Sequence, residues 1–148
     1  MEIPYFSTYN YILKNIKKEN TEEIGPFDNL IETIPGVTSI NASTARLNLP
    51  LTCGDEKLII LPGIPDIKEI EDILADFENV VILKLSRNYK QFINFLKDSG
   101  YENKFAFISK CNYTEEFITT DLAELEEREI DYLSLMILKN EIGEIHHM

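Results

Sequence analysis

Two adjacent hydroxyl side chains, Thr38 and Ser39, follow a turn-forming Pro35 and Gly36 and precede an apolar helical pattern. The first N–H groups of a helix lack intrahelical partners, and hydroxyls at this position accept hydrogen bonds from them. Backbone donors and short hydroxyls at a strand end also form a platform for a ligand, because α/β sheets bind ligands outside the carboxyl ends of their strands. Residues 34–47 therefore predict either a capped turn that binds nothing or the edge of a ligand site.

The other residues whose side chains could act in catalysis or bind a metal match no common catalytic or metal-binding pattern. The sequence contains no Ser/His/Asp arrangement and no paired-cysteine motif. His146 and His147 lie in a polar tail without partners at metal-ligand spacing. Cys53 and Cys111 are isolated from each other in sequence, which favours reduced thiols over a disulfide framework. We therefore predict no metal site, and the pattern identifies no catalytic base.

Composition disfavours several classes of partner. The 148 residues are 44% hydrophobic and 27% charged, which is typical of one globular domain. The 14 Lys and Arg against 26 Asp and Glu give a net charge of −12, whereas nucleic-acid binding needs clustered cations. No run approaches the roughly 20 apolar residues of a membrane span, and no signal-peptide pattern opens the sequence. We expect a cytoplasmic protein with neither nucleic-acid nor membrane partners.

Four segments with apolar residues at helical spacing predict helices. Their inner faces, in chain order, are Tyr9, Ile12, Leu13 and Ile16; Ile40, Thr44 and Leu47; Ile67, Ile70 and Leu74; and Tyr89, Phe92, Ile93 and Leu96. Pro50 and Gly100 should end the second and fourth helices. Asp66 with Glu69 resembles a capping box that opens the third.

Short apolar runs of strand character alternate with these helices at 30–34, 58–61, 80–85, 105–108 and 133–138. Runs without polar alternation suit strands covered on both faces, and strands separated by helices predict an α/β layered domain. The last segments lack helices of crossover length, which predicts at least one antiparallel strand. We expect a single layered domain with a mixed sheet of about five strands flanked by helices, and an acidic solvated connection or short helix over 122–129.

The stretch 34–63 also carries a resemblance to a known family. Its Pro-Gly-Val-Thr-Ser string at 35–39 resembles the same block of the tetrapyrrole methylase superfamily. The continuation resembles more narrowly the carbon-20 methyltransferases of precorrin-2 or cobalt-factor II, through Leu-Pro-Leu at 49–51, Gly-Asp-Glu at 54–56 and Leu-Pro-Gly at 61–63. Further blocks agree in order and spacing. They are Phe6 to Tyr9, the strand ending near Lys84, and Asp131 to Leu135.

The resemblance implies S-adenosylmethionine-dependent methyl transfer in cobalamin biosynthesis. In that family the donor binds between two α/β domains, largely through backbone contacts, and an electron-rich macrocycle carbon attacks its methyl group. The protein therefore chiefly aligns donor and acceptor. Here Glu2, Ile3 and Pro4 stand where the family has Gly-Asp-Pro, and the resemblance begins only at this loop, so we expect the family's N-terminal domain to be absent. We accordingly expect residues 1–148 to be a C-terminal domain, from an excision or a truncated gene, and to be inactive alone.

Family donor contacts, carried over by motif position, fall on Phe6, Ser7, Thr8, Thr38, Ser39, Leu83, Ser109, Lys110, Leu133 and Ser134. Each has an ordinary alternative, since the leucines suit a core and the first hydroxyls suit a helix cap. A tetrapyrrole bears several carboxylates, which makes the cations near the motifs candidates for binding it: Arg46, Lys84 and Arg87. Ordinary surface charge is the alternative for these three.

Two other functions stay open. One is another tetrapyrrole methylase or a diphthine synthase, against which the succession of motifs at 49–63 argues. The other is a noncatalytic domain that dimerises or binds a ligand. The resemblance places an apolar surface around Tyr5, Phe6 and Tyr9 that the absent domain would cover. Exposed apolar patches favour association, so we expect a homodimer.

Overall fold

The computed structural model describes residues 34–140 and Ile142. The chain divides into two compact units, Met1–Gly36 and Val37–Met148, and all described helices and strands belong to the second. The predicted helix over 9–16 and the predicted strand over 30–34 lie outside the described residues, Ile34 excepted. One domain over residues 1–148 therefore stays a prediction.

Helices and strands alternate along the second unit. In chain order they are α2 (Ser39–Leu47), β1 (Leu58–Leu61), α3 (Ile67–Asp76), β2 (Asn79–Leu83), α4 (Tyr89–Asp98), β3 (Phe105–Ser109), β4 (Phe117–Thr119), α5 (Leu122–Glu126) and β5 (Ser134–Lys139).

The strands form one mixed sheet in the order β1-β2-β5-β3-β4. β1 and β2 are parallel, whereas β5 is antiparallel to both of its neighbours, β2 and β3, and β4 is antiparallel to β3. The predicted α/β fold with a mixed sheet of about five strands is therefore confirmed.

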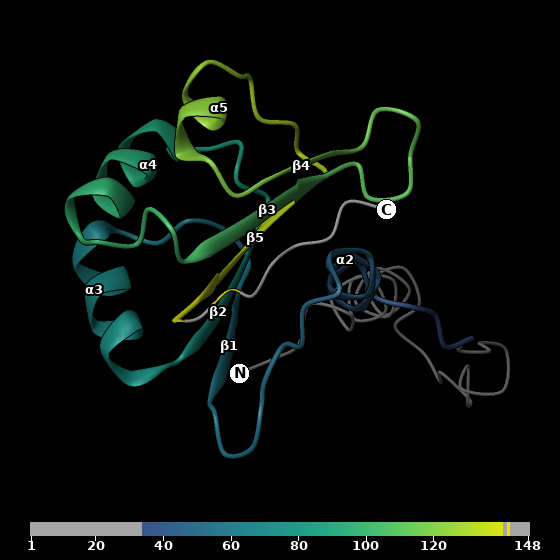
Figure 1. The fold of residues 1–148 in the computed structure, drawn as a ribbon, viewed down its shortest axis with the longest axis horizontal. Helices are drawn as coiled ribbons and strands as arrows, with labels where there is room; N and C mark the ends of the chain where they lie inside the picture. Colours follow the sequence, from purple (N-terminus) through teal and green to yellow (C-terminus); the bar gives the residue numbers. More distant parts are fainter. Residues whose placement is uncertain (1–33, 141, 143–148) are drawn as a thin grey trace, which may run out of the picture. The chain divides into compact units, whose positions relative to one another are not determined.

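Helices cover both faces of this sheet, with α3, α4 and α5 on one side and α2 on the other (Figure 1). Strand β2 shows how the sequence supports two cores. Val80 and Ile82 pack under α3 and α4, Val81 packs under α2, and all three are fully buried. Successive side chains point to opposite faces of a strand, so an unbroken apolar run serves both cores.

Several local predictions need correction. Ile67 is 38% exposed and does not share the buried face of α3 with Ile70. Asp66 occupies the N-cap position of α3, but its side chain makes no capping hydrogen bond, so no capping box forms. The predicted strand over 80–85 stops at Leu83 because Lys84 adopts a left-handed φ of 56°.

The last third of the chain contains two elements that the sequence pattern defined poorly. β4 has only 3 residues, Phe117–Thr119, too few for an apolar run to stand out. The acidic stretch 122–129 begins with a short helix, α5, because Leu122 and Leu125 are buried against the core while its acidic residues face solvent. The Asp121 side chain caps this helix by accepting from the Ala123 N–H at 2.8 Å.

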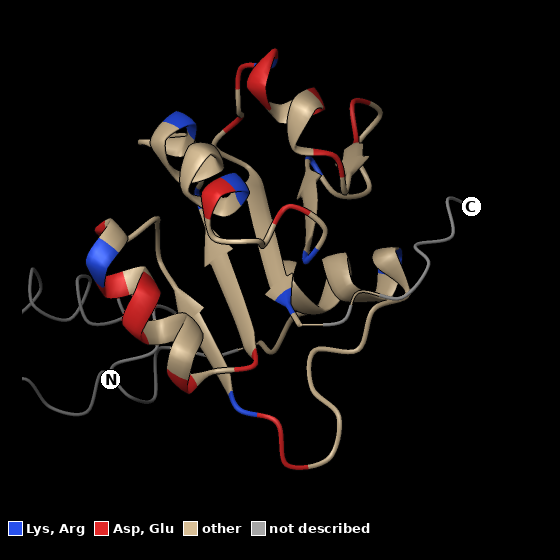
Figure 2. Ribbon diagram, turned by 60° about the vertical axis from the view of Figure 1, so that its left-hand side comes forward, with Lys and Arg blue, Asp and Glu red and all other residues tan. Residues whose placement is uncertain are grey.

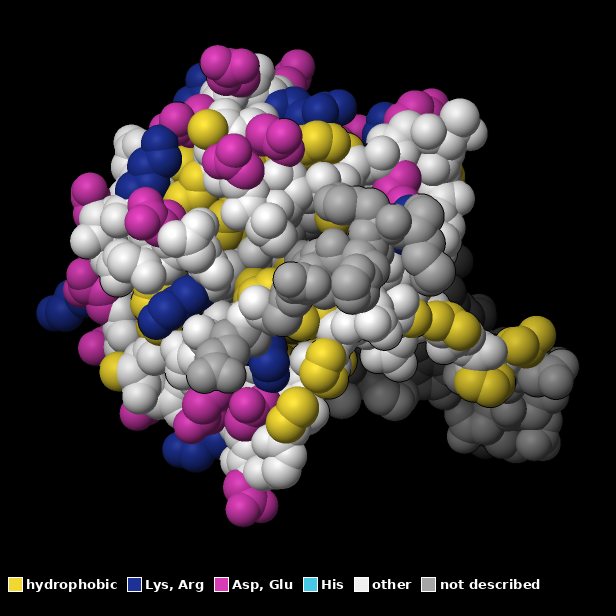
Figure 3. Space-filling model, viewed as in Figure 1, with side chains coloured by type: hydrophobic (Ala, Val, Ile, Leu, Met, Phe, Trp, Pro, Cys, Tyr) yellow, Lys and Arg dark blue, Asp and Glu magenta, His cyan; other side chains and the backbone are white. Residues whose placement is uncertain are grey.

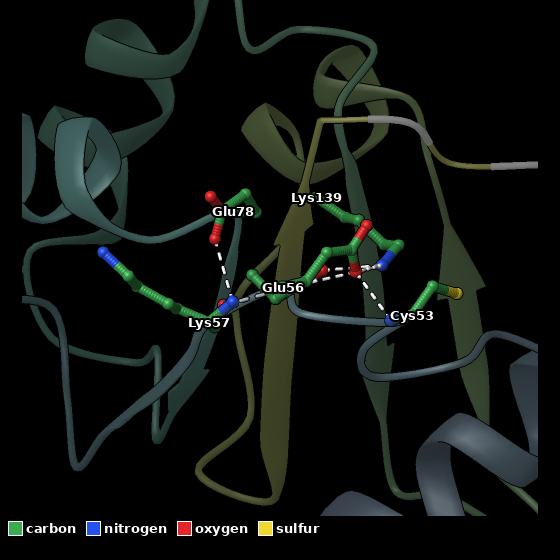
Figure 4. Close-up of polar contacts among 6 residues, drawn as sticks. Cys53, Glu56, Lys57, Glu78 and Lys139 are labelled. Atoms are coloured by element: carbon green, nitrogen blue, oxygen red, sulfur yellow. Dashed lines mark hydrogen bonds and ion pairs between the residues drawn. The ribbon is translucent and has the colours of Figure 1, made fainter.

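A buried polar network closes the sheet at the ends of β1, β2 and β5 (Figure 4). The ammonium of Lys139 donates to the Glu56 carboxylate at 2.8 Å and to the Asn79 side-chain oxygen at 2.7 Å. Glu56 also accepts from the Asn79 amide at 3.0 Å and from the Cys53 N–H at 2.8 Å. Chiefly through Lys139, these donors lower the pKa of Glu56 to about 2. The Gly-Asp-Glu motif at 54–56 thus has a structural task.

We predict that Glu56→Gln destabilises the fold at neutral pH and that this loss shrinks as the pH falls. The folded-state pKa lies below the ordinary value of 4.5, so between about 4.5 and about 2 the unfolded chain binds the extra proton. The contribution of Glu56 is therefore full above that window and is lost within it. Urea unfolding of both proteins from pH 7 to pH 3 measures the difference.

Glu102→Gln is the matched control, because Glu102 is exposed and has no ion-pair partner in the described part of the chain. Its stability should stay within about 0.5 kcal/mol of the parent at each pH. A gap between Glu56→Gln and the parent that does not change with pH would contradict the assignment.

Candidate functional site

The candidate site lies at the end of the sheet opposite the Lys139 network, where β2 and β3 end and β5 begins between them. Leu83 pairs with Leu135, and Ser109 pairs with Ser134. Just beyond these pairs, the Lys84 N–H donates to the Ser134 carbonyl at 3.0 Å and the Lys110 N–H donates to the Leu133 carbonyl at 2.8 Å. The antiparallel insertion of β5 thus brings three distant segments together.

The two flanking strands leave the sheet in the same way. Lys84 after β2 has φ 56°, and Lys110 after β3 has φ 48°. A non-glycine residue in this left-handed region is uncommon, and such residues concentrate where a backbone is held for function. Here both lysines turn the chain away from the sheet directly beside the start of β5, which leaves a hollow between the two turns.

That hollow is a cavity of about 320 Å³, which we call the first cavity. Its volume is at the low end of the range for small-molecule pockets, about 300–1,000 Å³. Five predicted donor contacts line it, and so does Lys84. The predicted contacts are Ser39, Leu83, Lys110, Leu133 and Ser134. Leu83 and Ile108 give it an apolar floor, while serines from α2 and β5 supply hydroxyls.

Asp131 fixes the wall formed by residues 132–134. Its carboxylate accepts from the Leu133 N–H at 2.8 Å and pairs with the Lys110 ammonium at 3.3 Å. Its carbonyl accepts from the Ser134 hydroxyl at 2.6 Å. The Leu133 N–H, and after it the Lys110 ammonium, hold the pKa of Asp131 below its ordinary value. Asp131 therefore stays ionised at neutral pH and keeps this wall in one conformation.

The remaining predicted residues lie elsewhere. Thr38 is the N-cap of α2, where its hydroxyl accepts from the Asn41 N–H at 3.1 Å. Ser109 is buried at the end of β3 and does not line the first cavity. The Arg46 guanidinium pairs with Glu116 at 2.9 Å and does not line the first cavity. Arg87 lines a neighbouring hollow. Phe6, Ser7 and Thr8 lie outside the described residues.

Sequence reasoning missed the aromatic rim of the first cavity. Tyr113 and Tyr132 line it and are 62% and 59% exposed. Tyr132 stands inside the motif at 131–135 and could have been included on that ground. Tyr113 follows the β3 turn and carries no such signal. Cys111, Ala42, Ser43 and Leu135 complete the lining.

The family model of the Tetrapyrrole (Corrin/Porphyrin) Methylases matches residues 5–126. This chain belongs to that family. The match includes α2, β1, β2 and β3 and so includes most segments that surround the first cavity. The family resemblance inferred from the motifs is thereby confirmed.

Among curated relatives, the "Probable cobalt-precorrin-2 C(20)-methyltransferase" of Methanocaldococcus jannaschii is 30% identical over 138 residues, which are 90% of this chain and 54% of that protein. The "Precorrin-2 C(20)-methyltransferase" of a Sinorhizobium species is 32% identical over 73% of this chain and 44% of that protein. The chain therefore spans about half the length of the relatives it matches.

Two solved structures share the fold. A cobalt precorrin-4 methyltransferase of cobalamin biosynthesis matches with a TM-score of 0.62 at 18% identity, over 90% of this chain and 60% of that one. A uroporphyrin-III C-methyltransferase of Thermus thermophilus, solved with S-adenosyl homocysteine, matches with a TM-score of 0.50 at 23% identity, over 74% and 52%. At these identities the likeness extends to the fold alone.

No helix among the described residues is long and apolar enough to cross a membrane. No group of three or more His, Cys, Asp and Glu side chains in residues 34–140 and 142 is arranged to hold a metal ion.

We predict that Thr38→Val lowers the free energy of unfolding by about 1 kcal/mol, because valine cannot accept the Asn41 N–H. Thr38→Ser keeps a hydroxyl and should lose less than half as much. Thermal unfolding compares the three proteins.

If Thr38 also contacts a donor in a complete enzyme, Thr38→Val should weaken donor binding there by about 1–2 kcal/mol. Reduced stability with unchanged donor affinity would assign Thr38 to capping alone.

Proposed function

We propose that this chain is the C-terminal part of an S-adenosylmethionine-dependent methyltransferase that acts on carbon 20 of precorrin-2 or cobalt-factor II. The relatives at 30% and 32% identity carry carbon-20 methyltransferase names, which supports the position of methylation and the place in cobalamin biosynthesis. The methyl donor would bind in the first cavity. We also propose that the protein is cytoplasmic and forms a homodimer. Sedimentation of the purified protein tests the homodimer.

One observation carries the proposal. Ser39, Leu83, Lys110, Leu133 and Ser134 were predicted as donor contacts from motifs that lie up to 95 residues apart in sequence, and all five line the first cavity. Their meeting at a sheet edge also agrees with the general rule that α/β sheets bind ligands beyond strand ends.

The apolar lining of the cavity and one balanced lysine support the binding of a sulfonium donor. When bound, the donor supplies a methyl group on a good leaving group, so the protein needs no nucleophile of its own. Two lysines line the cavity. Asp131 at 3.3 Å balances the charge of Lys110, which limits its repulsion of a cationic ligand, whereas the Lys84 ammonium lies 5.5 Å from the centre of the Tyr132 ring. Leu83, Ile108 and Leu135 exclude water from the floor. The hydroxyls of Ser39 and Ser43 and nearby backbone groups would orient the donor.

We predict that the 148-residue polypeptide alone transfers no methyl group to precorrin-2, since it spans 54% of the Methanocaldococcus relative. Joining it to the N-terminal half of that relative should produce transfer to carbon 20. Incubation with precorrin-2 and S-adenosylmethionine labelled in its methyl group, followed by NMR of the product, measures both amount and position.

Leu83→Glu in the joined protein tests the first cavity directly. A carboxylate on the cavity floor costs desolvation and disrupts the apolar wall, so transfer should fall at least tenfold. Glu102→Gln is the control, because Glu102 is exposed and does not line the first cavity, and it should leave transfer unchanged. Methylation at another carbon would overturn the carbon-20 assignment while leaving the family intact.

A further inference from the structure

A second, larger cavity lies beside the first. Its volume is about 740 Å³, and it is formed mainly by the β1–α3 connection and the β2–α4 connection. The two cavities share Lys84 and Tyr132, so these side chains form the partition between them. One wall of the second cavity is apolar and consists of Leu61, Pro62, Ile64 and Pro65.

The opposite wall carries two cations, Lys84 and Arg87. Within residues 34–140 and 142, neither forms an ion pair, whereas Arg46, Lys97, Lys110 and Lys139 each pair with a carboxylate. Acidic and basic side chains are mixed over the helical part of the surface (Figure 3), so carboxylates are abundant in general. Five other cations of the described residues, Lys57, Lys68, Lys90, Lys104 and Arg128, also form no ion pair. Lys84 and Arg87 differ from them because both line the second cavity.

The carboxylates themselves concentrate on other elements. Figure 2 shows Asp and Glu along α3 and α5. One of them, Glu69 in the first turn of α3, lines the second cavity and is the acidic member of its lining. It forms no ion pair with Lys84 or Arg87. The cavity therefore presents two positive groups on the β2–α4 connection and one negative group on α3.

The β2–α4 connection, which carries Lys84 and Arg87, is anchored in the hydrophobic core. Leu85 is only 1% exposed and anchors the segment between the two cations. Lys84 and Asn88 both adopt left-handed φ values, 56° and 57°, which bracket the turn. The Lys84 ammonium lies 5.5 Å from the centre of the Tyr132 ring, a cation–π contact that leaves its remaining hydrogen-bond capacity for a ligand. The two cations are thus presented by an anchored turn.

We propose that the second cavity binds carboxylate side chains of a tetrapyrrole acceptor through Lys84 and Arg87, with the macrocycle against the proline-containing wall. The planar guanidinium of Arg87 suits bidentate pairing with a carboxylate, and Lys84 adds a second charge at the partition. An acceptor held there would lie beside the donor cavity, as methyl transfer requires. This assignment rests on the proposed function. It assigns acceptor binding to Lys84 and Arg87 but not to Arg46, which pairs with Glu116.

The test is a fluorescence titration of the 148-residue chain with a stable porphyrin octacarboxylate as the probe. Lys84→Gln and Arg87→Gln should each weaken binding about fivefold, the upper scale of an exposed ion pair, and the double variant should weaken it further. Glutamine at position 84 meets the same left-handed backbone as lysine, so the turn is retained. Thermal unfolding verifies that each variant is folded.

Two further variants are matched controls. Lys90→Gln makes the same change in net charge but does not line the second cavity, and it should alter affinity less than twofold. Glu69→Gln removes the negative group of the lining and should tighten binding or leave it unchanged. A porphyrin with four carboxylates should bind more weakly than the octacarboxylate.

Three outcomes would overturn the proposal: no binding of the octacarboxylate, equal losses in Lys90→Gln and Arg87→Gln, or tighter binding in Lys84→Gln. None of these would refute carbon-20 methyl transfer, because the activity of the protein joined to its relative's N-terminal half is measured separately. Conversely, cation-dependent porphyrin binding by a chain that yields no carbon-20 product would keep the second cavity and overturn the proposed reaction.

Discussion

The antiparallel insertion of β5 between β2 and β3 is the constraint on which the rest of this unit depends. Every residue of β5 is buried, and its two faces contribute to two separate cores. Because it runs against both neighbours, its first residues meet the last residues of β2 and β3 at one edge. The chain must then approach β5 through the gap between two departing strands. Residues 131–134 fill that gap, and the hydrogen bonds of Asp131 with Leu133 and Ser134 fix their conformation.

The other end of β5 is fixed by a different interaction. Lys139 is buried to 7% exposure and would be costly without partners, but Glu56 and Asn79 accept its hydrogen bonds. The same carboxylate holds the Cys53 N–H, so the connection from α2 to β1 is tied to the central strand. Gly54 allows the turn with φ 58°. A sequence motif that resembled a functional signature therefore also secures the sheet opposite the candidate site.

The sequence predicted those features that depend on local pattern. Apolar runs located β1, β2, β3 and β5 to within two residues, because strands buried on both faces need no alternation. The partners of Lys139 were not predictable, since Glu56 lies 83 residues away and only the fold brings the two together. Helix caps show the same limit. Thr38 caps α2 as its residue type suggested, whereas Asp66 has the right type and position but makes no bond.

Charge illustrates why residue type alone does not define a binding site. Arg46 and Arg87 are both arginines close to family motifs, and the sequence gives no reason to prefer one. The fold distinguishes them: Glu116 pairs with Arg46 at 2.9 Å, while Arg87 shares a cavity wall with Lys84. An anionic protein that binds an anionic ligand needs only a few cations without carboxylate neighbours, provided that the surrounding carboxylates are held on other elements. The total charge of −12 therefore constrains the acceptor site less than the ion pairs within the fold do.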